Sequence, residues 1–318
     1  MNPQITVSIV SYNTRELLRQ CLQTLREQDE PLQILVVDNG STDGSVEMVR
    51  AEFADVELIQ SGGNIGFGRA NNLAFERARG RYFLLLNSDA FPHAGALAIL
   101  REWMEAHPEV GAVGPQLLFP DGALQTSWGD DPQRSGIFWE QTFLGAVRGK
   151  VERLLARTAP VEITEAREVE QLPGACELVR AEAYRQIAGF DPNFWMYVED
   201  VDFNIRLRAA GWPIWFVPQS RVTHHLGGSS GKWQSRARMV TAYNASRVYF
   251  YDKIEGPQSA RLVKRWMVLG ALIRSAIWTS LFWVRPGALE KIKLFRYVLR
   301  RTVRLRDKWQ GTWDKGGE

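Results

Sequence analysis

The stretch Tyr82-Phe83-Leu84-Leu85-Leu86-Asn87-Ser88-Asp89 decides the fold class, because it is an apolar run that ends abruptly in polar residues. Five consecutive apolar residues predict a strand buried on both faces, as in the parallel sheets of α/β proteins. Asp89 then follows the carboxyl end of that strand, where open α/β sheets bind their ligands. A carboxylate in that position can hold a hard cation, which in turn can neutralise a diphosphate.

Strand and helix patterns alternate along the rest of the chain. Aliphatic and β-branched runs predict strands at residues 5–10, 32–37, 56–59, 176–179 and 213–217. Apolar residues at helical spacing predict helices at residues 16–28, 46–53, 67–79 and 181–188, with a further helix opening at Glu199. The alternation predicts a doubly wound α/β sheet. Residues 119–170 lack a clear period, and we expect irregular, substrate-facing structure there.

Composition is that of a globular protein with one main domain and an appendage. The chain has 318 residues, of which 45% are hydrophobic, enough to bury a full core. Its two cysteines, Cys21 and Cys176, suggest neither a disulfide framework nor a zinc site, so a reducing compartment is expected. The first residues have no signal-peptide pattern, which predicts a cytoplasmic location.

Basic charge is concentrated in the tail. Residues 261–318 contain 14 Lys and Arg against 4 Asp and Glu, a net charge of +10, whereas the remaining 25 basic and 32 acidic residues give −7. Residues 266–284 are apolar for nearly the length of a membrane span, but Arg274 at their centre costs about 2.5–3.5 kcal/mol in a bilayer, so crossing is not expected. Residues 290–309 show the pattern of an amphipathic interfacial helix. A helical pair packed on the main domain is the alternative, and no nucleic-acid motif accompanies the charge.

A second acidic group, Glu199-Asp200-Val201-Asp202, stands at the predicted start of a helix, where acids are stabilised whatever their function. Three acids in four positions also repel one another and invite a cation or a raised pKa, which favours a functional role for Asp200. His224 and His225 follow further on. Adjacent residues of a strand face opposite ways, so at most one of the two histidines is expected to bind a metal.

Two turns allow both a functional and a local interpretation. Asp38 ends a predicted strand and either accepts hydrogen bonds from a ligand or caps its own loop. Residues 62–72 form a glycine-rich turn that opens a helix. Free amides there could attract phosphate, but the spacing is not that of a dinucleotide-binding loop, and tight turns need glycine for backbone reasons alone.

These residues together resemble family 2 of the inverting, nucleotide-sugar-dependent glycosyltransferases, which have the GT-A fold, and especially its bacterial rhamnosyltransferase-like members. The resemblance covers roughly residues 5–235 in order. It rests on Val7-Ser8-Ile9-Val10-Ser11-Tyr12-Asn13, Val37-Asp38-Asn39-Gly40-Ser41, Asn64-Ile65-Gly66-Phe67, Leu86-Asn87-Ser88-Asp89, Gly189-Phe190-Asp191, Glu199-Asp200-Val201-Asp202 and His224-His225.

The resemblance implies a role for each candidate residue. Asp200 would be the general base with Glu199 beside it, and Asp89 and His224 would bind Mg²⁺ or Mn²⁺ on the diphosphate. Donor contacts would come from Ser11, Tyr12, Asn13, Asp38, Asn64, Gly66, Asn71, Asn87 and Ser88. The family's usual Asp-x-Asp begins here with Asn87, which removes one negative charge.

We therefore expect a metal-dependent inverting transferase that moves a sugar from a dTDP- or UDP-sugar to a glycan or polyprenyl-diphosphate-linked acceptor in cell-envelope polysaccharide synthesis. Rhamnose is the sugar that the resemblance favours. Residues 1–240 would form the GT-A domain, with the donor part at 1–118 and the acceptor part at 119–240. Residues 241–318 would be a helical extension whose segment 261–309 contacts the inner membrane surface. Alternatives are a sugar nucleotidylyltransferase and a non-catalytic scaffold that binds nucleotide-sugar.

Overall fold

The computed structural model describes residues 3–142, 163–225 and 233–305 of the chain. The chain divides into two compact units. Unit 1 comprises Met1–Asp131, Glu162–Trp195 and Glu199–Gly228, and unit 2 comprises Pro132–Val161, Met196–Val198 and Ser229–Glu318. Residue 240, where the sequence suggested a boundary, lies inside a helix of unit 2.

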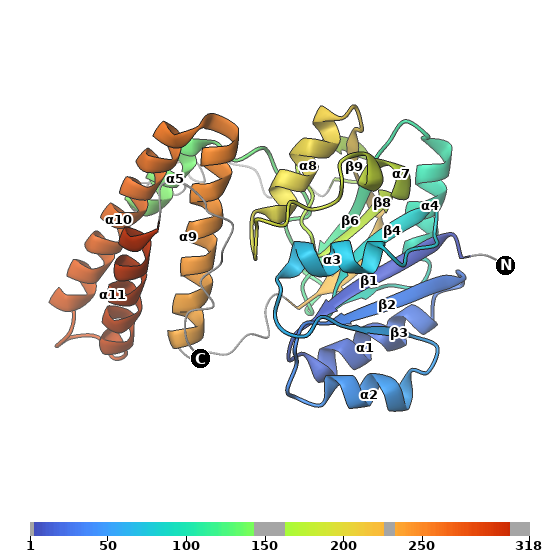
Figure 1. Ribbon diagram of the computed structural model, residues 1–318, viewed down its shortest axis with the longest axis horizontal. Helices are drawn as coiled ribbons and strands as arrows, with labels where there is room; N and C mark the ends of the chain where they lie inside the picture. Colours follow the sequence, from blue (N-terminus) through green and yellow to red (C-terminus); the bar gives the residue numbers. More distant parts are fainter. Residues whose placement is uncertain (1–2, 143–162, 226–232, 306–318) are drawn as a thin grey trace. The chain divides into compact units, whose positions relative to one another are not determined.

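Unit 1 is built on one mixed sheet with the strand order β3-β2-β1-β4-β8-β6-β9-β5, and β7 pairs with β9 (Figure 1). The strands are β1 (Ile5–Ser11), β2 (Leu32–Asp38), β3 (Glu57–Gln60), β4 (Tyr82–Asn87), β5 (Ala90–Pro92), β6 (Ala112–Leu118), β7 (Arg167–Val169), β8 (Cys176–Arg180) and β9 (Ile214–His224).

The parallel part of the sheet contains a reversal of strand order. β1 pairs in parallel with both β2 and β4, and β2 pairs in parallel with β3. The chain therefore moves outward from β1 in one direction through β2 and β3, and then returns to the other side of β1 with β4. This is the topological switch point of a doubly wound sheet, where the loops after two adjacent strands diverge.

The other part of the sheet departs from a purely parallel arrangement. β8 lies between β4 and β6 and is antiparallel to both, while β6 and β9 are parallel to each other. β5 and β7 are each antiparallel to β9. The predicted doubly wound α/β sheet is thus confirmed, and the antiparallel strands β5, β7 and β8 make it mixed.

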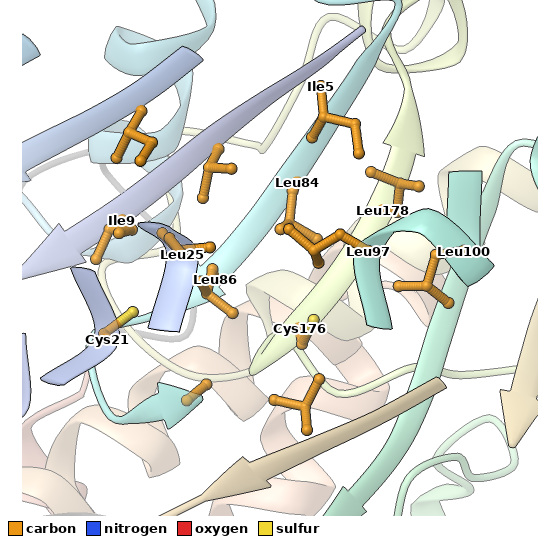
Figure 2. Close-up of a cluster of buried hydrophobic side chains, with 14 of the residues drawn as sticks. Ile5, Ile9, Cys21, Leu25, Leu84, Leu86, Leu97, Leu100, Cys176 and Leu178 are labelled. Carbon is orange, nitrogen blue, oxygen red and sulfur yellow. The ribbon is translucent and has the colours of Figure 1, made fainter. Parts of the chain in front are cut away.

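Helices cover both faces of the sheet because alternate residues of each strand point to opposite sides. On one face, α1 (Arg15–Arg26), α2 (Ser45–Glu52) and α4 (Ala96–Ala106) pack over the first apolar cluster. Figure 2 shows the strand side chains Ile5, Ile9 and Leu84 of that cluster together with Leu25 and Leu97 from the helices. On the other face, α3 (Phe67–Phe75), α7 (Ala181–Gln186) and α8 (Glu199–Ala209) cover the second cluster.

Both cysteines lie in the first of these cores, and both are free thiols. Burial raises the pKa of the Cys21 thiol and of the Cys176 thiol well above the ordinary value. A buried, protonated thiol behaves as a small apolar side chain, so these cysteines serve packing.

Several predicted elements differ in extent from those observed. The strand predicted at 213–217 continues to His224, because a register shift opposite Pro115 and Gln116 lets β9 pass the polar residues that interrupt its apolar pattern. The helix predicted at 67–79 ends at Phe75. The segment 119–170, expected to be irregular, contains α5 (Arg134–Gln141) and β7, and its residues 143–162 lie outside the described part.

Unit 2 contains α5 with three longer helices, α9 (Trp233–Glu255), α10 (Pro257–Ser280) and α11 (Ala288–Arg304), which pack against one another. One buried cluster of this unit consists of small and aliphatic residues, namely Ala237, Ala271, Leu294 and Val298. Buried Asn244 of α9 donates a hydrogen bond to the Thr302 hydroxyl of α11 at 3.1 Å. The amphipathic helix predicted at 290–309 corresponds to α11 as far as Arg304, and residues 306–309 lie outside the described part.

Arg274 has a structural role in the middle of α10. Its guanidinium donates to the side-chain oxygen of Gln141 at 2.8 Å and to the carbonyl of Glu140 at 3.0 Å, both on α5. Gly270, one turn earlier, leaves room for α5, since a Cβ there would lie 2.4 Å from the Gln141 side chain. No helix among the described residues combines the length and apolar character needed to cross a membrane.

Candidate active site

The loops after β1 and β4 meet at the switch point of the sheet. Buried Ser11 ends β1, and its hydroxyl lies 3.0 Å from the hydroxyl of Thr14. Thr14 in turn donates to the Ser88 hydroxyl at 2.9 Å. This chain of hydroxyl groups joins two of the predicted donor-binding segments, Ser11–Asn13 and Asn87–Ser88, although 74 positions separate Thr14 from Ser88.

The loops after β1 and β2 are also tied together. The side-chain oxygen of Asn13 accepts a hydrogen bond from the Thr42 backbone amide at 2.7 Å, and the backbone amide of Asn13 donates to the Ser41 hydroxyl. Asp38 accepts the amides of Gly40 and Ser41 at 3.2 and 3.3 Å, so its carboxylate caps its own loop. A carboxylate has about four acceptor positions, so Asp38 keeps capacity for a ligand. Tyr12 is 49% exposed beside these polar groups.

The glycine-rich turn is held by side-chain caps. The Asn64 side-chain oxygen accepts the Gly66 amide at 3.2 Å, and Asn39 accepts the amide of Ile65. Gly66 has a positive φ of 91°, and a Cβ there would lie 2.1 Å from the Trp195 carbonyl oxygen. Glycine is therefore required at this position by backbone conformation and by close packing, which favours the local interpretation of the turn.

Asn71 does not lie with the other predicted donor-binding residues. It is fully buried beneath β1, where its side-chain oxygen accepts the Ser8 hydroxyl at 2.7 Å. Its side-chain amide donates to the Phe67 carbonyl at 3.1 Å. Both ends of the side chain are therefore engaged within the fold, and the bond to Ser8 holds α3 on the sheet.

Asp89 and His224 lie next to each other, with Nε2 of the imidazole 3.4 Å from Oδ1 of the carboxylate. β5 pairs with β9 so that Ala90 stands opposite His224, which brings the histidine beside the end of β4. The Asn87 side-chain amide is also 3.4 Å from Nε2. The predicted pair is thus brought together across 135 positions of sequence by the pairing of these two strands.

A glutamine fixes the tautomer of His224. The imidazole Nδ1 lies 2.8 Å from Oε1 of Gln125, while the Gln125 amide nitrogen is 3.5 Å from the His224 carbonyl oxygen. Because an amide oxygen only accepts, Nδ1 carries a proton, and Nε2, which faces Asp89, is the ring nitrogen left to bind a ligand. An imidazole nitrogen and a carboxylate oxygen that lie 3.4 Å apart can share a cation.

This donor set fits a cation that takes its remaining ligands from phosphate oxygens and water. Within the described segments, no group of three His, Cys, Asp or Glu side chains gathers to hold a metal ion alone. The ring of the neighbouring His225 packs edge-on against Phe91 instead, with the ring centroids 4.9 Å apart.

Asp200 stands in the first turn of α8, and its carboxylate is held in place by backbone amides. Oδ2 accepts the Gly174 amide at 3.3 Å, and Oδ1 accepts the Val201 amide at 2.9 Å. Ala175, which follows Gly174, accepts a hydrogen bond from the backbone amide of Asn87 at 2.9 Å through its carbonyl oxygen. Two consecutive residues before β8 therefore connect the end of β4 with Asp200.

Backbone strain immediately precedes this acid. Tyr197 and Val198 have positive φ values of 67° and 68°. Such a conformation is rare for a residue other than glycine and more costly for a β-branched one such as Val198. Strained backbone of this kind clusters at functional sites, where the surrounding structure holds it in place.

Three buried acids accompany Asp200, namely Glu199, Glu177 and Asp202, and they differ in pKa and in bonding partners. Burial, together with the neighbouring Asp200, raises the pKa of Glu199 to about 8. The same two causes raise the pKa of Glu177 well above its ordinary value. Burial also raises the pKa of Asp200 itself, against the opposing effect of its backbone hydrogen bonds. Asp202, the third acid of the motif, forms an ion pair with Arg206 at 2.7 Å and so stabilises α8.

Sequence reasoning missed Gln125, Gly174 and Glu177. Gln125 lies in the segment expected to be irregular and carries no motif. Gly174 acts through its amide, for which a sequence has no signal. Glu177 does have one, because it is an acid inside the otherwise apolar run of β8, but its proximity to Asp200 depends on the start of α8 lying beside the residues that precede β8.

Comparisons with known proteins identify the family and the fold of the chain. Residues 6–158 match the model of the family described as glycosyl transferase family 2. The chain is 30% identical over 293 residues to the N-acetylglucosaminyl-diphospho-decaprenol L-rhamnosyltransferase of Mycobacterium tuberculosis, covering 86% of this chain and 91% of that protein. It is 27% identical over 244 residues to the rhamnosyltransferase WbbL of Escherichia coli, covering 73% and 88% of the two chains.

The fold also matches solved structures. The mannosyltransferase PcManGT from Pyrobaculum calidifontis, solved in complex with GDP-Man and Mn²⁺, superposes with a TM-score of 0.52 at 19% identity, covering 96% of this chain and 87% of that one. At this identity the likeness concerns the fold alone, which is the predicted GT-A fold. With the family match and the mycobacterial relative, it leads to the conclusion that the chain belongs to glycosyl transferase family 2 and is a glycosyltransferase.

Proposed function

We propose that the chain transfers rhamnose from dTDP-rhamnose to a glycan carried on a polyprenyl diphosphate, in the synthesis of a cell-envelope polysaccharide. The observation that carries this proposal is the similarity to the mycobacterial enzyme over 91% of that enzyme's length, because the name of that enzyme states both the sugar and a diphospho-decaprenol acceptor. The similarity to a second rhamnosyltransferase supports the same sugar.

The donor binds at the switch point of the sheet in this proposal. The loops after β1 and β2, with Ser11, Tyr12, Asn13 and Asp38, hold the nucleoside, and Asn87 and Ser88 lie toward the diphosphate. Exposed Tyr12 offers an aromatic face for a base, and the Asp38 carboxylate keeps acceptor capacity for ribose or base. Asn64 and Gly66 shape the turn next to this region. Asn71 makes no contact with the donor in this proposal, because its side chain is fully buried.

Asp89 and His224 hold Mg²⁺ or Mn²⁺ in this proposal. The bound cation would stabilise the negative charge that develops on the departing nucleoside diphosphate. The Nδ1–H tautomer held by Gln125 and the position of Asp89 beside Nε2 support the assignment. Asn87 replaces the first acid of the family's motif, and its amide lies within 3.4 Å of the same nitrogen.

Asp200 is the general base. The acceptor hydroxyl oxygen forms a bond to the anomeric carbon as the bond from that carbon to the diphosphate oxygen breaks, and the hydroxyl proton passes to the Asp200 carboxylate. A raised pKa makes this carboxylate a better proton acceptor near neutral pH. A single displacement with no enzymic nucleophile inverts the anomeric configuration. Glu199, beside it, supplies a protonated neighbour.

The place of action in this proposal is the cytoplasmic face of the cell membrane, with the basic segment 261–309 in contact with the lipid surface. A lipid-linked acceptor and the tail's excess of basic residues support this placement. Family membership sets aside the nucleotidylyltransferase alternative. The similarity to two rhamnosyltransferases sets aside the scaffold alternative as well, although Asn87 replaces one acid of the motif.

Substitution of Asp200 by Asn tests the proposal. We expect transfer to fall by at least about 100-fold, because the base is removed, while donor binding is retained. Binding is measured as a thermal shift with dTDP-rhamnose and Mn²⁺, since a ligand at about 100 times its Kd adds about 2.7 kcal/mol to stability. Asp55→Asn, an exposed acid beyond α2, is the matched control. Equal loss of transfer and of donor binding in Asp200→Asn contradicts the general-base role, and a larger shift with another nucleotide sugar contradicts the assigned donor.

A further inference from the structure

The turn between α10 and α11 exposes large apolar side chains to solvent. Trp283 is 89% exposed, Val284 is 74% exposed and Phe282 is 40% exposed. These three residues, here called the hairpin tip, lie at the end of the two helices, where Figure 1 shows α10 turning into α11. The rings of Phe282 and Trp283 pack edge-on at 5.1 Å, so the two aromatic side chains form one apolar surface. An exposed cluster of neighbouring large apolar side chains is typical of an interaction surface.

The apolar surface continues from the hairpin tip along α10. Leu269, Leu272 and Ile277 are all exposed and lead toward the tip. The opposite face of the same helix is already used, because Val263, Met267 and Ala271 are buried in unit 2. α10 therefore has two apolar faces, and only one of them contributes to the packing of the described helices.

Helix α11 adds a basic face next to the tip. Residues 281–305 contain seven Lys and Arg against a single acid, Glu290. Four of the basic residues are exposed at helical spacing, namely Lys293, Arg296, Arg300 and Arg304. None of these four forms an ion pair within the described ranges. A continuous run of unneutralised cations on one helix face attracts a polyanionic surface.

We propose that the hairpin tip inserts into the interface of a bilayer that contains anionic lipid, with the basic face of α11 on the headgroups. Tryptophan and phenylalanine prefer the boundary between headgroups and acyl chains, and basic residues beside them bind anionic headgroups. A second copy of the chain is a poorer occupant, because a two-fold contact would bring two basic faces together. This assignment rests on the proposed function, in which segment 261–309 contacts the membrane, and it identifies the residues that make the contact. It is tested without any sugar substrate.

A fluorescent label at the tip gives the test. Both native cysteines are buried, so Trp283→Cys in the full-length chain can be labelled selectively with an environment-sensitive dye. The matched control is Ile254→Cys. Ile254 is 48% exposed in the same unit, but it precedes α10, whose 24 residues span about 36 Å. The probes are phosphatidylcholine vesicles with and without about one third phosphatidylglycerol.

We expect the label at residue 283 to shift to the blue and brighten with anionic vesicles, and the label at residue 254 to stay unchanged. Vesicle sedimentation of unlabelled protein gives a second measurement. There, Phe282→Ser with Trp283→Ser lowers the partition coefficient at least about tenfold, and each of Lys293→Gln, Arg296→Gln and Arg300→Gln lowers it about fivefold. The Ile254→Ser control partitions as the wild type does.

Three results overturn the proposal. They are an unchanged label at residue 283, equal changes at residues 283 and 254, and a shift at residue 283 that follows protein concentration without vesicles, which indicates self-association. Nucleotide-induced thermal shifts and transfer to a soluble acceptor analogue do not depend on the tip. If the vesicle experiment fails while the thermal shifts and the transfer activity are intact, only the membrane surface is rejected. If the vesicle experiment succeeds while the thermal shifts and the transfer activity fail, the proposed donor and acceptor are rejected.

Discussion

Asp200 and Glu199 are neighbours in the chain, but their surroundings give them different protonation behaviour. Glu199 is buried beside a second carboxylate, and its pKa rises to about 8, so it holds a proton at neutral pH. The pKa of Asp200 is also raised by burial, but the amides of Gly174 and Val201 stabilise its charged form. One acid is thereby suited to accept a proton and its neighbour to keep one.

The raised pKa of Glu199 predicts a pH-dependent effect on stability. In the unfolded chain Glu199 has its ordinary pKa of 4.5, and in the folded chain about 8. Between these values unfolding releases a proton, so the contribution of Glu199 to stability is full below pH 4.5 and is lost as pH rises to 8. Glu199→Gln mimics the protonated acid at every pH. We expect its unfolding free energy to exceed that of the wild type increasingly from pH 5 to pH 8.

Urea unfolding of both proteins at several pH values checks this expectation. One pKa unit corresponds to about 1.4 kcal/mol, so the difference at pH 8 is large enough to measure. Glu182→Gln, an exposed glutamate in α7, serves as the control and shows no such trend. A difference between Glu199→Gln and wild type that stays constant with pH contradicts the buried, protonated state of Glu199.

Gln125 sets the orientation and tautomer of His224, which predicts an effect on metal affinity. In Gln125→Ala the Nδ1 proton loses its acceptor, and the imidazole is free to rotate or to change tautomer. Loss of such a supporting partner typically costs 10- to 100-fold in metal affinity, so we expect the Mn²⁺ concentration for half-maximal activity to rise by about that factor.

Activity at saturating Mn²⁺ distinguishes this role from a purely structural one. We expect Gln125→Ala to recover most of its kcat there, and Gln125→Glu, which keeps an acceptor oxygen, to need less added metal than Gln125→Ala does. His224→Ala removes the ligand itself and should not be rescued. If kcat of Gln125→Ala stays low at every Mn²⁺ concentration, the tautomer argument fails.

At the scale of elements, the contact between α5 and α10 depends on Arg274. Its guanidinium donates to Gln141 and to the Glu140 carbonyl, and Gly270 lets the helices approach. From the sequence alone, Arg274 indicated only that residues 266–284 are not expected to form a membrane span, because a charge at their centre is costly. The fold gives it hydrogen-bond partners within unit 2, because α5 supplies side-chain and carbonyl oxygens at one end.

Arg274→Leu is therefore expected to destabilise the protein, although it makes α10 more apolar. Loss of the guanidinium leaves the Gln141 oxygen without its donor, at a cost of about 1–3 kcal/mol. Arg265 is exposed and lies nine residues earlier on the same helix, so Arg265→Leu is the matched control and should change stability by less than about 0.5 kcal/mol. Thermal unfolding of both variants makes the comparison, and equal effects would reject the specific role of Arg274.

At the scale of the whole molecule, the two compact units have separate cores and separate proposed tasks. The residues that surround the switch point belong to unit 1, and the hairpin tip belongs to unit 2. Hydrogen exchange followed by mass spectrometry can observe both at once. With nucleotide-sugar and Mn²⁺ we expect slower exchange after β1, β2 and β4 and at the start of α8, and no change in α10 or α11.

Anionic vesicles without nucleotide should give the opposite pattern, with protection at residues 281–289 alone. Vesicles of neutral lipid provide the control. Protection of the hairpin tip by nucleotide-sugar, or of the β1 and β4 loops by vesicles, contradicts this division of tasks between the units.

The sequence by itself determined the strands of the parallel half, the mixed α/β class and the acids and histidines worth considering. These follow from local patterns, because a buried strand needs a short apolar run and a site needs polar residues where that run ends. The Asp89, Asp200 and His224 motifs were visible for this reason, as was the amphipathic character of α11.

Only the tertiary structure decided how those residues act. The antiparallel insertion of β8 between β4 and β6 brings Gly174 to Asp200 and Ala175 to Asn87, and Gln125 reaches His224 across 99 positions. Tautomer, protonation state and the engagement of Asn71 all depend on such long-range neighbours. A pKa or a hydrogen-bond partner is set by atoms within a few ångströms in space, and local sequence patterns do not specify which distant segments supply those atoms.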